Sequence, residues 1–195
     1  MEPTILIYFV AFIVLNTATI LLPTTVKQFS LIDLTKSADK VVWAHCKHTA
    51  LELIDGEIYT NYEFLVIETI KGRHTPSITL SLPGGIFQGV HHKIVGMPIF
   101  NPGIDELLFL TQATHQKSAW PIGLYQGAAR IIDDINGVSR VFFRQKPHLT
   151  ENFRHKKLAT PNRNSLIRSE TYNGKPLETI LRHIRSLISG RTNDR

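Results

Sequence analysis

The sequence predicts a mainly β protein, either a small antiparallel β-barrel or a β-sandwich, with an N-terminal hydrophobic helix and a C-terminal amphipathic helix. Residues 57–70 alternate apolar or aromatic with polar side chains, which is the period of a half-buried strand. Asp55-Gly56 and Asn136-Gly137 are hairpin signals between apolar runs. Because several such short runs follow one another with few helical patterns, we expect hairpin-connected strands.

The elements are expected in the following order. A short helix at residues 29–39 has Ser30 as its cap. Strands are predicted at residues 40–53, 57–70, 77–82, 105–111, 120–124, 127–133 and 138–143. Residues 86–103 are rich in Gly and Pro and indicate a loop. These elements predict a β domain over residues 27–143.

The N-terminal segment at residues 5–22 contains no charged residue. As a helix its 18 residues would span about 27 Å, close to the bilayer core of about 30 Å. Residues 1–26 are therefore expected to be a cleaved signal peptide or a retained membrane anchor, with a buried core helix as the third alternative. Either of the first two predicts an exported protein, held in the cell envelope through this segment or secreted or periplasmic.

The C-terminal quarter is basic. Residues 140–195 contain 13 Lys or Arg and 4 Asp or Glu. Within the predicted linker at residues 144–174, the cations considered for binding are Arg154, Lys156, Lys157 and Arg163. Anionic lipid or an envelope polyanion would suit them, whereas nucleic acid is not expected outside the cytoplasm; a solubilising tail is the alternative.

A second helix is expected at residues 175–190. Its apolar side chains recur at helical spacing, and Pro176 and Gly190 suit its start and end. The apolar stripe is expected to pack on the β domain, although a membrane interface or a partner could also receive it.

A metal site is one hypothesis for the chemistry of the chain. Cys46 is the single cysteine, so the chain has no internal disulfide. On a regular strand Cys46 and His48 would share one face, and His92 could join them from the Gly-rich loop. The alternative is that Cys46 is a small core residue and the histidines are surface groups. No cofactor is predicted.

Catalytic patterns do not stand out in the sequence. It contains no Gly-x-Ser-x-Gly motif. Two acidic pairs, Asp105-Glu106 and Asp133-Asp134, are adjacent along the chain. Adjacent side chains on a strand face opposite ways, so neither pair is a natural acid/base dyad. Gly84-Gly85 is expected to allow positive φ or a close backbone approach rather than phosphate binding.

The middle of the chain combines several short motifs: Lys71-Gly72, Pro83-Gly84-Gly85, Gly96-x-Pro98-x-Phe100, Leu107-Leu108-Phe109-Leu110 and Gln126-Gly127. This pattern resembles a family of uncharacterised exported bacterial proteins over residues 30–143, with a typical C-terminal helix. The resemblance implies a small β-barrel of the OB or metalloproteinase-inhibitor type, with no assigned catalytic residue. The sequence departs from the family at Ile104, where an acidic residue is usual after Gly103, and in the basic insertion after Phe143.

The function expected from these patterns is a non-enzymatic binding or interaction module of the cell envelope. One alternative is a metal-binding protein or metal-dependent enzyme that uses Cys46, His48 and His92. A further alternative, an inhibitor of an exported protease, depends on the barrel resemblance alone.

Overall fold

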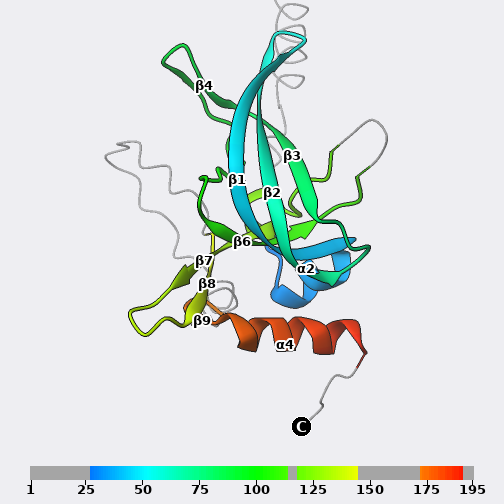
Figure 1. The fold of residues 1–195 in the computed structure, drawn as a ribbon. Coiled ribbons are helices and arrows are strands. Elements are labelled where there is room, and N and C mark those ends of the chain that lie inside the picture. The colour runs from blue at the N-terminus through cyan, green and yellow to red at the C-terminus, as the bar shows by residue number, and fades with distance from the viewer. Residues whose placement is uncertain (1–26, 114–117, 145–171, 191–195) are drawn as a thin grey trace, which may run out of the picture.

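A computed structural model describes residues 27–113, 118–144 and 172–190 of the 195-residue chain (Figure 1). The predicted signal or anchor segment at residues 5–22 lies outside these ranges. The four basic residues Arg154, Lys156, Lys157 and Arg163 also lie outside them. Within the described ranges the protein is mainly β, as predicted.

Seven strands form one antiparallel sheet in the order β3-β2-β1-β6-β7-β8-β9. Their bounds are β1 Lys40–Ile54, β2 Glu57–Lys71, β3 Ser77–Pro83, β6 Asp105–Leu110, β7 Ala128–Asp133, β8 Ser139–Phe143 and β9 Lys175–Pro176. Six predicted strands are confirmed to within one residue at each end. Their period-two patterns and turn residues are local signals, which explains this agreement.

A separate hairpin consists of β4 Gly85–Phe87 and β5 Val90–His92. Its turn residues Gln88 and Gly89 have φ values of 49° and 79°, and Phe87 pairs with Val90 across the turn. The sequence predicts only a loop here, because strands of three residues are too short to show a period. The hairpin and the β1–β2 turn extend to the same end of the molecule, opposite α4 Leu177–Ile188 (Figure 1).

The prediction of a closed barrel is wrong. The sheet is open, with β3 at one end of the strand order and β9 at the other. The hydroxyl of Ser118 receives a hydrogen bond from the Ser81 N–H (3.2 Å) and donates one to the Ser81 C=O (3.4 Å). A side chain therefore satisfies this edge of β3 where barrel closure would place another strand. The described residues do not form a sandwich either, because their second sheet contains only β4 and β5.

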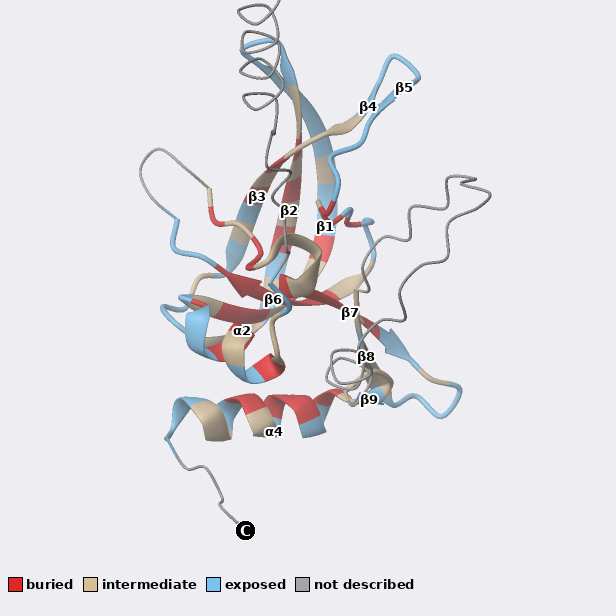
Figure 2. Ribbon diagram, turned by 180° about the vertical axis from the view of Figure 1, so that it is seen from behind, coloured by how far each residue is buried: buried red, intermediate tan, exposed pale blue. Residues whose placement is uncertain are grey.

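Each face of the sheet has its own hydrophobic core. On the face that carries α2 Leu31–Ser37 and α4, named the convex face here, Val41, Leu107 and Phe109 pack with these helices. On the opposite face, named the concave face here, Phe64 and Leu108 pack with residues from the loops, including Phe100 and Ala119. β6 contributes side chains to both cores, so its Leu-Leu-Phe-Leu run is buried on both faces of the sheet (Figure 2). This is why its sequence lacks alternation.

Of the described elements, α2 and α4 cover the convex face. Ser30 caps α2: its hydroxyl accepts a hydrogen bond from the Asp33 N–H, and the Asp33 carboxylate accepts one from the Ser30 N–H. The predicted cap is therefore confirmed. α4 turns Leu177, Ile180, Leu181 and Ile184 toward the sheet, where they are buried in the same core as the residues of α2.

The strand predicted at residues 120–124 is not formed. Only one isolated bridge occurs there, between Leu110 and Pro121. Gly123 and Leu124 both have positive φ, and a 3-10 helix, η1 Leu124–Gly127, follows. Pro121 lacks an N–H to donate to a ladder, and positive φ interrupts the extended backbone.

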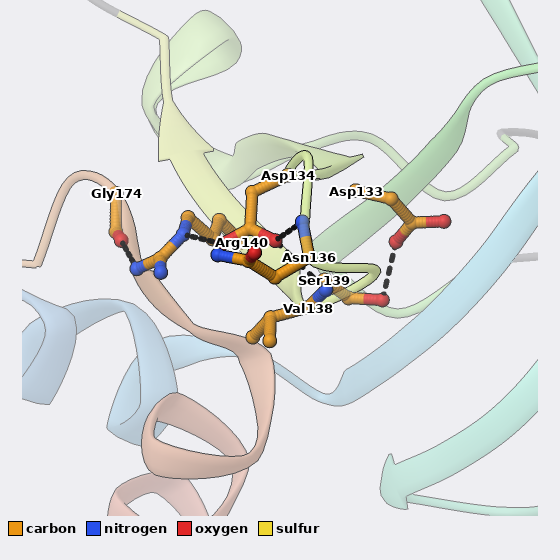
Figure 3. A network of polar contacts seen from close by, with 7 residues as sticks. All are labelled: Asp133, Asp134, Asn136, Val138, Ser139, Arg140 and Gly174. Carbon is orange, nitrogen blue, oxygen red and sulfur yellow. Dashed lines mark hydrogen bonds and ion pairs between the residues drawn. The ribbon is translucent and has the colours of Figure 1, made fainter.

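The β7–β8 turn is held by one aspartate (Figure 3). Asp134 accepts hydrogen bonds from the N–H groups of Asn136 (2.8 Å) and Val138 (3.0 Å) and from Arg140 Nε (2.7 Å). The Val138 N–H and the Arg140 guanidinium lower the pKa of Asp134. Arg140 also donates to the Gly174 carbonyl (2.8 Å). Asp134 is therefore a turn residue that connects β8 with the chain before β9.

Candidate binding pocket

An open pocket of about 570 Å³ lies between the β1–β2 ribbon and the β4–β5 hairpin. Its walls come from the concave side of the ribbon, from the hairpin and from residues 93–100 that follow it. The apolar lining side chains include Leu51, Ile86, Ile94, Met97 and Ile99. The polar groups of the lining come from Thr49, Thr60, Tyr62, His91, His92 and Lys93. An apolar cleft with a few polar groups is the usual form of a ligand site.

The glycine pair at the start of β4 brings the hairpin close to the ribbon. Gly84 has a φ of 102° and donates a hydrogen bond to the Ile58 carbonyl (2.7 Å). A Cβ atom on Gly85 would lie 2.6 Å from both Leu51 Cδ2 and Thr60 Oγ1. The Thr60 hydroxyl in turn donates to the Gly84 carbonyl (2.6 Å). The expected positive φ and close backbone approach are both confirmed, and together they form one corner of the pocket.

Aromatic rings form the floor of the pocket. Tyr62 of β2 and Phe100 line the pocket and meet edge to face, with their ring centroids 5.1 Å apart. The fully buried ring of Phe64 meets Phe100 edge to face at 5.2 Å. Burial raises the pKa of the Tyr62 phenol, so its hydroxyl stays neutral at physiological pH. The floor therefore offers a rigid apolar surface and one phenolic group.

A buried charged cluster lies behind this floor. Glu106 is fully buried and accepts a hydrogen bond from Arg144, while Arg130 Nε lies 3.9 Å from the same carboxylate oxygen. Burial raises the pKa of Glu106 to about 7, against the opposing attraction of the two arginines. Glu106 Oε2 has no hydrogen-bond partner within the described ranges. The cluster is a costly buried arrangement that connects β6, β7 and the end of β8.

Cys46 lies on the concave face next to this cluster. It is fully buried, and burial, with a smaller contribution from the nearby Glu106 carboxylate, raises the pKa of its thiol to about 11. A neutral buried thiol is a poor nucleophile and a poor metal ligand at physiological pH. The alternative interpretation of Cys46 as a small core residue fits this environment.

The structure does not bring Cys46, His48 and His92 together. Cys46 pairs with Phe64 and His48 with the next residue, Glu63, so a bulge at Lys47 interrupts the register. The bulge turns His48 to the exposed convex face, while Cys46 stays in the concave core. The expectation that they share a face is therefore wrong. Among the residues described, no three His, Cys, Asp or Glu side chains form a group suited to a metal ion.

The adjacent acids of β6 face opposite ways, as predicted. Glu106 points into the concave core, whereas Asp105 lies on the convex side. One Asp105 oxygen lies 2.7 Å from His45 Nδ1, and the other accepts a hydrogen bond from Trp43 Nε1 (3.0 Å). This His–Asp pair was not predicted, since strand pairing alone places residue 45 opposite residue 105. It is separated from the pocket by the sheet.

Most of the pocket residues are not found by sequence reasoning. The period of β2 places Tyr62 on an apolar face, and Gly84-Gly85 signals a close approach, but neither identifies a cavity. His92, considered above as a metal ligand, instead belongs to the pocket wall with His91 and Lys93. The composition of residues 86–99 could have indicated an apolar surface, because this segment contains many large apolar side chains although none of its runs is long enough for a predicted strand.

Comparison with protein-family models, with curated proteins and with solved structures finds no match for this chain. The resemblance to exported bacterial proteins therefore stays a prediction. Among the described residues, no helix has both the length and the apolar character needed to cross a membrane.

Proposed function

We propose that this protein is a non-enzymatic binding module of the cell envelope, exported or anchored through residues 5–22, whose pocket holds an extended apolar ligand. The observation that carries the proposal is the open cleft of about 570 Å³. Its walls are mainly aliphatic and its floor is aromatic. An open cleft of this kind suits a chain-like apolar group with one polar end, for which Tyr62, His92 and Lys93 are the available partners.

The positions of the reactive side chains outside the pocket favour a binding function over a catalytic one. The Cys46 thiol is neutral and buried, and the His45–Asp105 pair lies on the other face of the sheet from the pocket. The protease-inhibitor alternative depends on a barrel that the sheet does not form. The metal-dependent alternative uses the set Cys46, His48 and His92, of which Cys46 and His48 lie on opposite sides of the bulge at Lys47 and face opposite ways.

The proposal is tested with a matched pair of substitutions. Leu51 lines the pocket and is 47% exposed, while Leu65 is 43% exposed on the convex face of the same ribbon. We expect Leu51→Asp to weaken binding of the apolar probe anilinonaphthalene sulfonate about tenfold, because a leucine contact contributes about 1.5 kcal/mol. Leu65→Asp should leave the affinity unchanged. Equal effects of the two changes, or no saturable binding, would contradict the proposal.

A further inference from the structure

We propose that the β4–β5 hairpin and the loop after it dock on the surface of a lipid bilayer. The docking surface, named here the apolar crest, consists of Ile86, Phe87, Val90, Ile94, Val95 and Ile99. All six side chains are between 38% and 69% exposed. Single exposed apolar residues are common, but six within 14 consecutive positions of one projecting element indicate an interaction surface.

The hairpin itself gains little from these side chains. Phe87 and Val90 pair across a tight turn at its tip, and both remain accessible to water. Two other turns place acids beside their exposed apolar residues: Leu53 and Ile54 precede Asp55, and Ile135 follows Asp134. A two-stranded hairpin of three-residue strands has no core of its own. Its apolar tip is therefore explained by something outside the chain.

The distribution of charge selects the hairpin as the docking element. His91, His92 and Lys93 follow Val90 directly, so one ammonium group and two imidazole rings lie behind the apolar tip. In a bilayer, the apolar side chains would enter the headgroup boundary, and these groups would reach the phosphates. The β1–β2 turn at the same end of the molecule carries Asp55 and Glu57, which would disfavour insertion.

The described chain begins next to the crest. The Lys27 carbonyl accepts a hydrogen bond from Gln126 Nε2 (3.1 Å) in η1. The adjacent Tyr125 N–H donates to the carbonyl of Gly96 (3.0 Å), which follows Val95 of the crest. The apolar segment 5–22 is thus separated from Lys27 by only four residues. If it anchors the protein as proposed, it holds this end of the domain against the bilayer and raises the local concentration of lipid at the crest.

This arrangement also orients the pocket. Ile86, Ile94 and Ile99 belong both to the crest and to the pocket wall. Docking of the crest would therefore bring the pocket to the level of the headgroups. An apolar ligand could then pass between bilayer and pocket without crossing water.

The test uses the full-length chain reconstituted in phosphatidylcholine vesicles that contain nitroxide-labelled lipid. A single environment-sensitive fluorophore is attached at Phe87→Cys or, as the control, at Ile135→Cys. Ile135 is 100% exposed in the β7–β8 turn, near the α4 end of the molecule. Because Cys46 is fully buried, it does not compete for the label. Unchanged thermal unfolding of both labelled proteins shows that each is folded.

We expect a blue-shifted emission and loss of fluorescence to the nitroxide at position 87, and neither effect at position 135. The inference rests on the proposed membrane location, and the two fail differently. A protein that floats with the vesicles but is not quenched at position 87 overturns the docking alone. A protein that does not float removes the membrane location as well. A blue shift at position 87 without vesicles, with a doubled mass in ultracentrifugation, would assign the crest to a second copy of the chain and overturn the inference.

Discussion

The guanidinium of Arg144 lies over the ring of Phe100, 5.0 Å from the ring centroid. The same guanidinium donates a hydrogen bond to the carboxylate of Glu106. Phe100 is part of the pocket floor, and Glu106 is part of the buried cluster. One side chain at the end of β8 therefore joins the aromatic floor to the charges behind it. A change in the cluster should therefore also move the pocket floor. The first two predictions concern the stability that Glu106 and Arg144 provide.

Stability should depend on the ionisation of Glu106. Burial raises the pKa of this carboxyl from 4.5 to about 7. Between these pH values the folded state keeps a proton that the unfolded state has released, so the free energy of unfolding falls as pH rises through this window. Below about 4.5 both states are protonated, and above about 7 both are ionised, so this contribution is constant there.

Glu106→Gln should remove this fall in the free energy of unfolding with rising pH, since an amide does not titrate. Urea unfolding at a series of pH values between 4 and 8.5 measures it, with Glu63→Gln as the control because Glu63 is an exposed partner of Lys47. The control should keep the wild-type slope. Identical pH profiles for wild type and Glu106→Gln would show that Glu106 does not titrate in this window.

Arg144→Met should destabilise the protein strongly at pH 8. Removing Arg144 leaves the buried Glu106 carboxyl without its hydrogen-bonded cation and with only Arg130 Nε at 3.9 Å; breaking a buried pair in this way costs about 3–5 kcal/mol. Arg185→Met breaks the more exposed pair with Glu68 and should cost about 1 kcal/mol or less. Chemical denaturation measures both, and the cost of Arg144→Met should be smaller at pH 5, where Glu106 can be neutral. Similar costs for the two arginines would contradict the importance of the buried cluster.

Gly85→Ala should displace the hairpin. The added methyl would meet Leu51 Cδ2 and Thr60 Oγ1 at 2.6 Å, and the Thr60 hydroxyl is already bonded to Gly84. We expect a loss of about 1–3 kcal/mol of stability, as in other overpacked sites, together with weaker binding of the apolar probe. Gly89→Ala at the hairpin tip has no atom within 4 Å of its new methyl, so it tests the effect of positive φ alone. Its probe affinity should equal that of the wild type.

Cys46 should resist modification in the folded protein. Its thiol is fully buried and has a pKa of about 11, so at pH 8 its reaction with a disulfide reagent should be at least about 100-fold slower than in the unfolded chain. The rate of thiol release in native buffer and in 8 M urea measures this difference. A fast reaction in native buffer would mean that the concave core opens readily around β1.

Local patterns in the sequence predict much of the secondary structure and little of the site. The alternation in β2 and the Ser30 cap each depend on residues a few positions apart, and both are confirmed. The strand predicted at residues 120–124 fails because Pro121 and the positive φ of Gly123 interrupt a run whose side chains look suitable. The hairpin at residues 85–92 was missed because its strands are shorter than the period that would reveal them.

The proposed metal set shows how pairing between strands changes an inference from spacing. Residues that are two positions apart on a regular strand share a face, and this rule predicted that Cys46 and His48 lie together. The extra residue Lys47 opposes no partner on β2, so every residue after it moves to the other face. Thr49 and Leu51 thereby turn toward the pocket, which makes the same bulge responsible for separating the metal set and for building one pocket wall.

By itself, the sequence determined six of the seven strands of the main sheet, where the Asp55-Gly56 hairpin turns and which face of α4 is apolar. Side-chain period and turn residues act within a few positions, which is why they are readable there. Only the tertiary structure decided that the sheet stays open, since Ser118 satisfies Ser81 at an edge that barrel closure would use. It also decided that Gly85 packs against Thr60 and that Arg144 reaches Glu106, contacts between residues 25 and 38 positions apart. Contacts over such separations depend on strand order and bulges, which neighbouring residues do not specify.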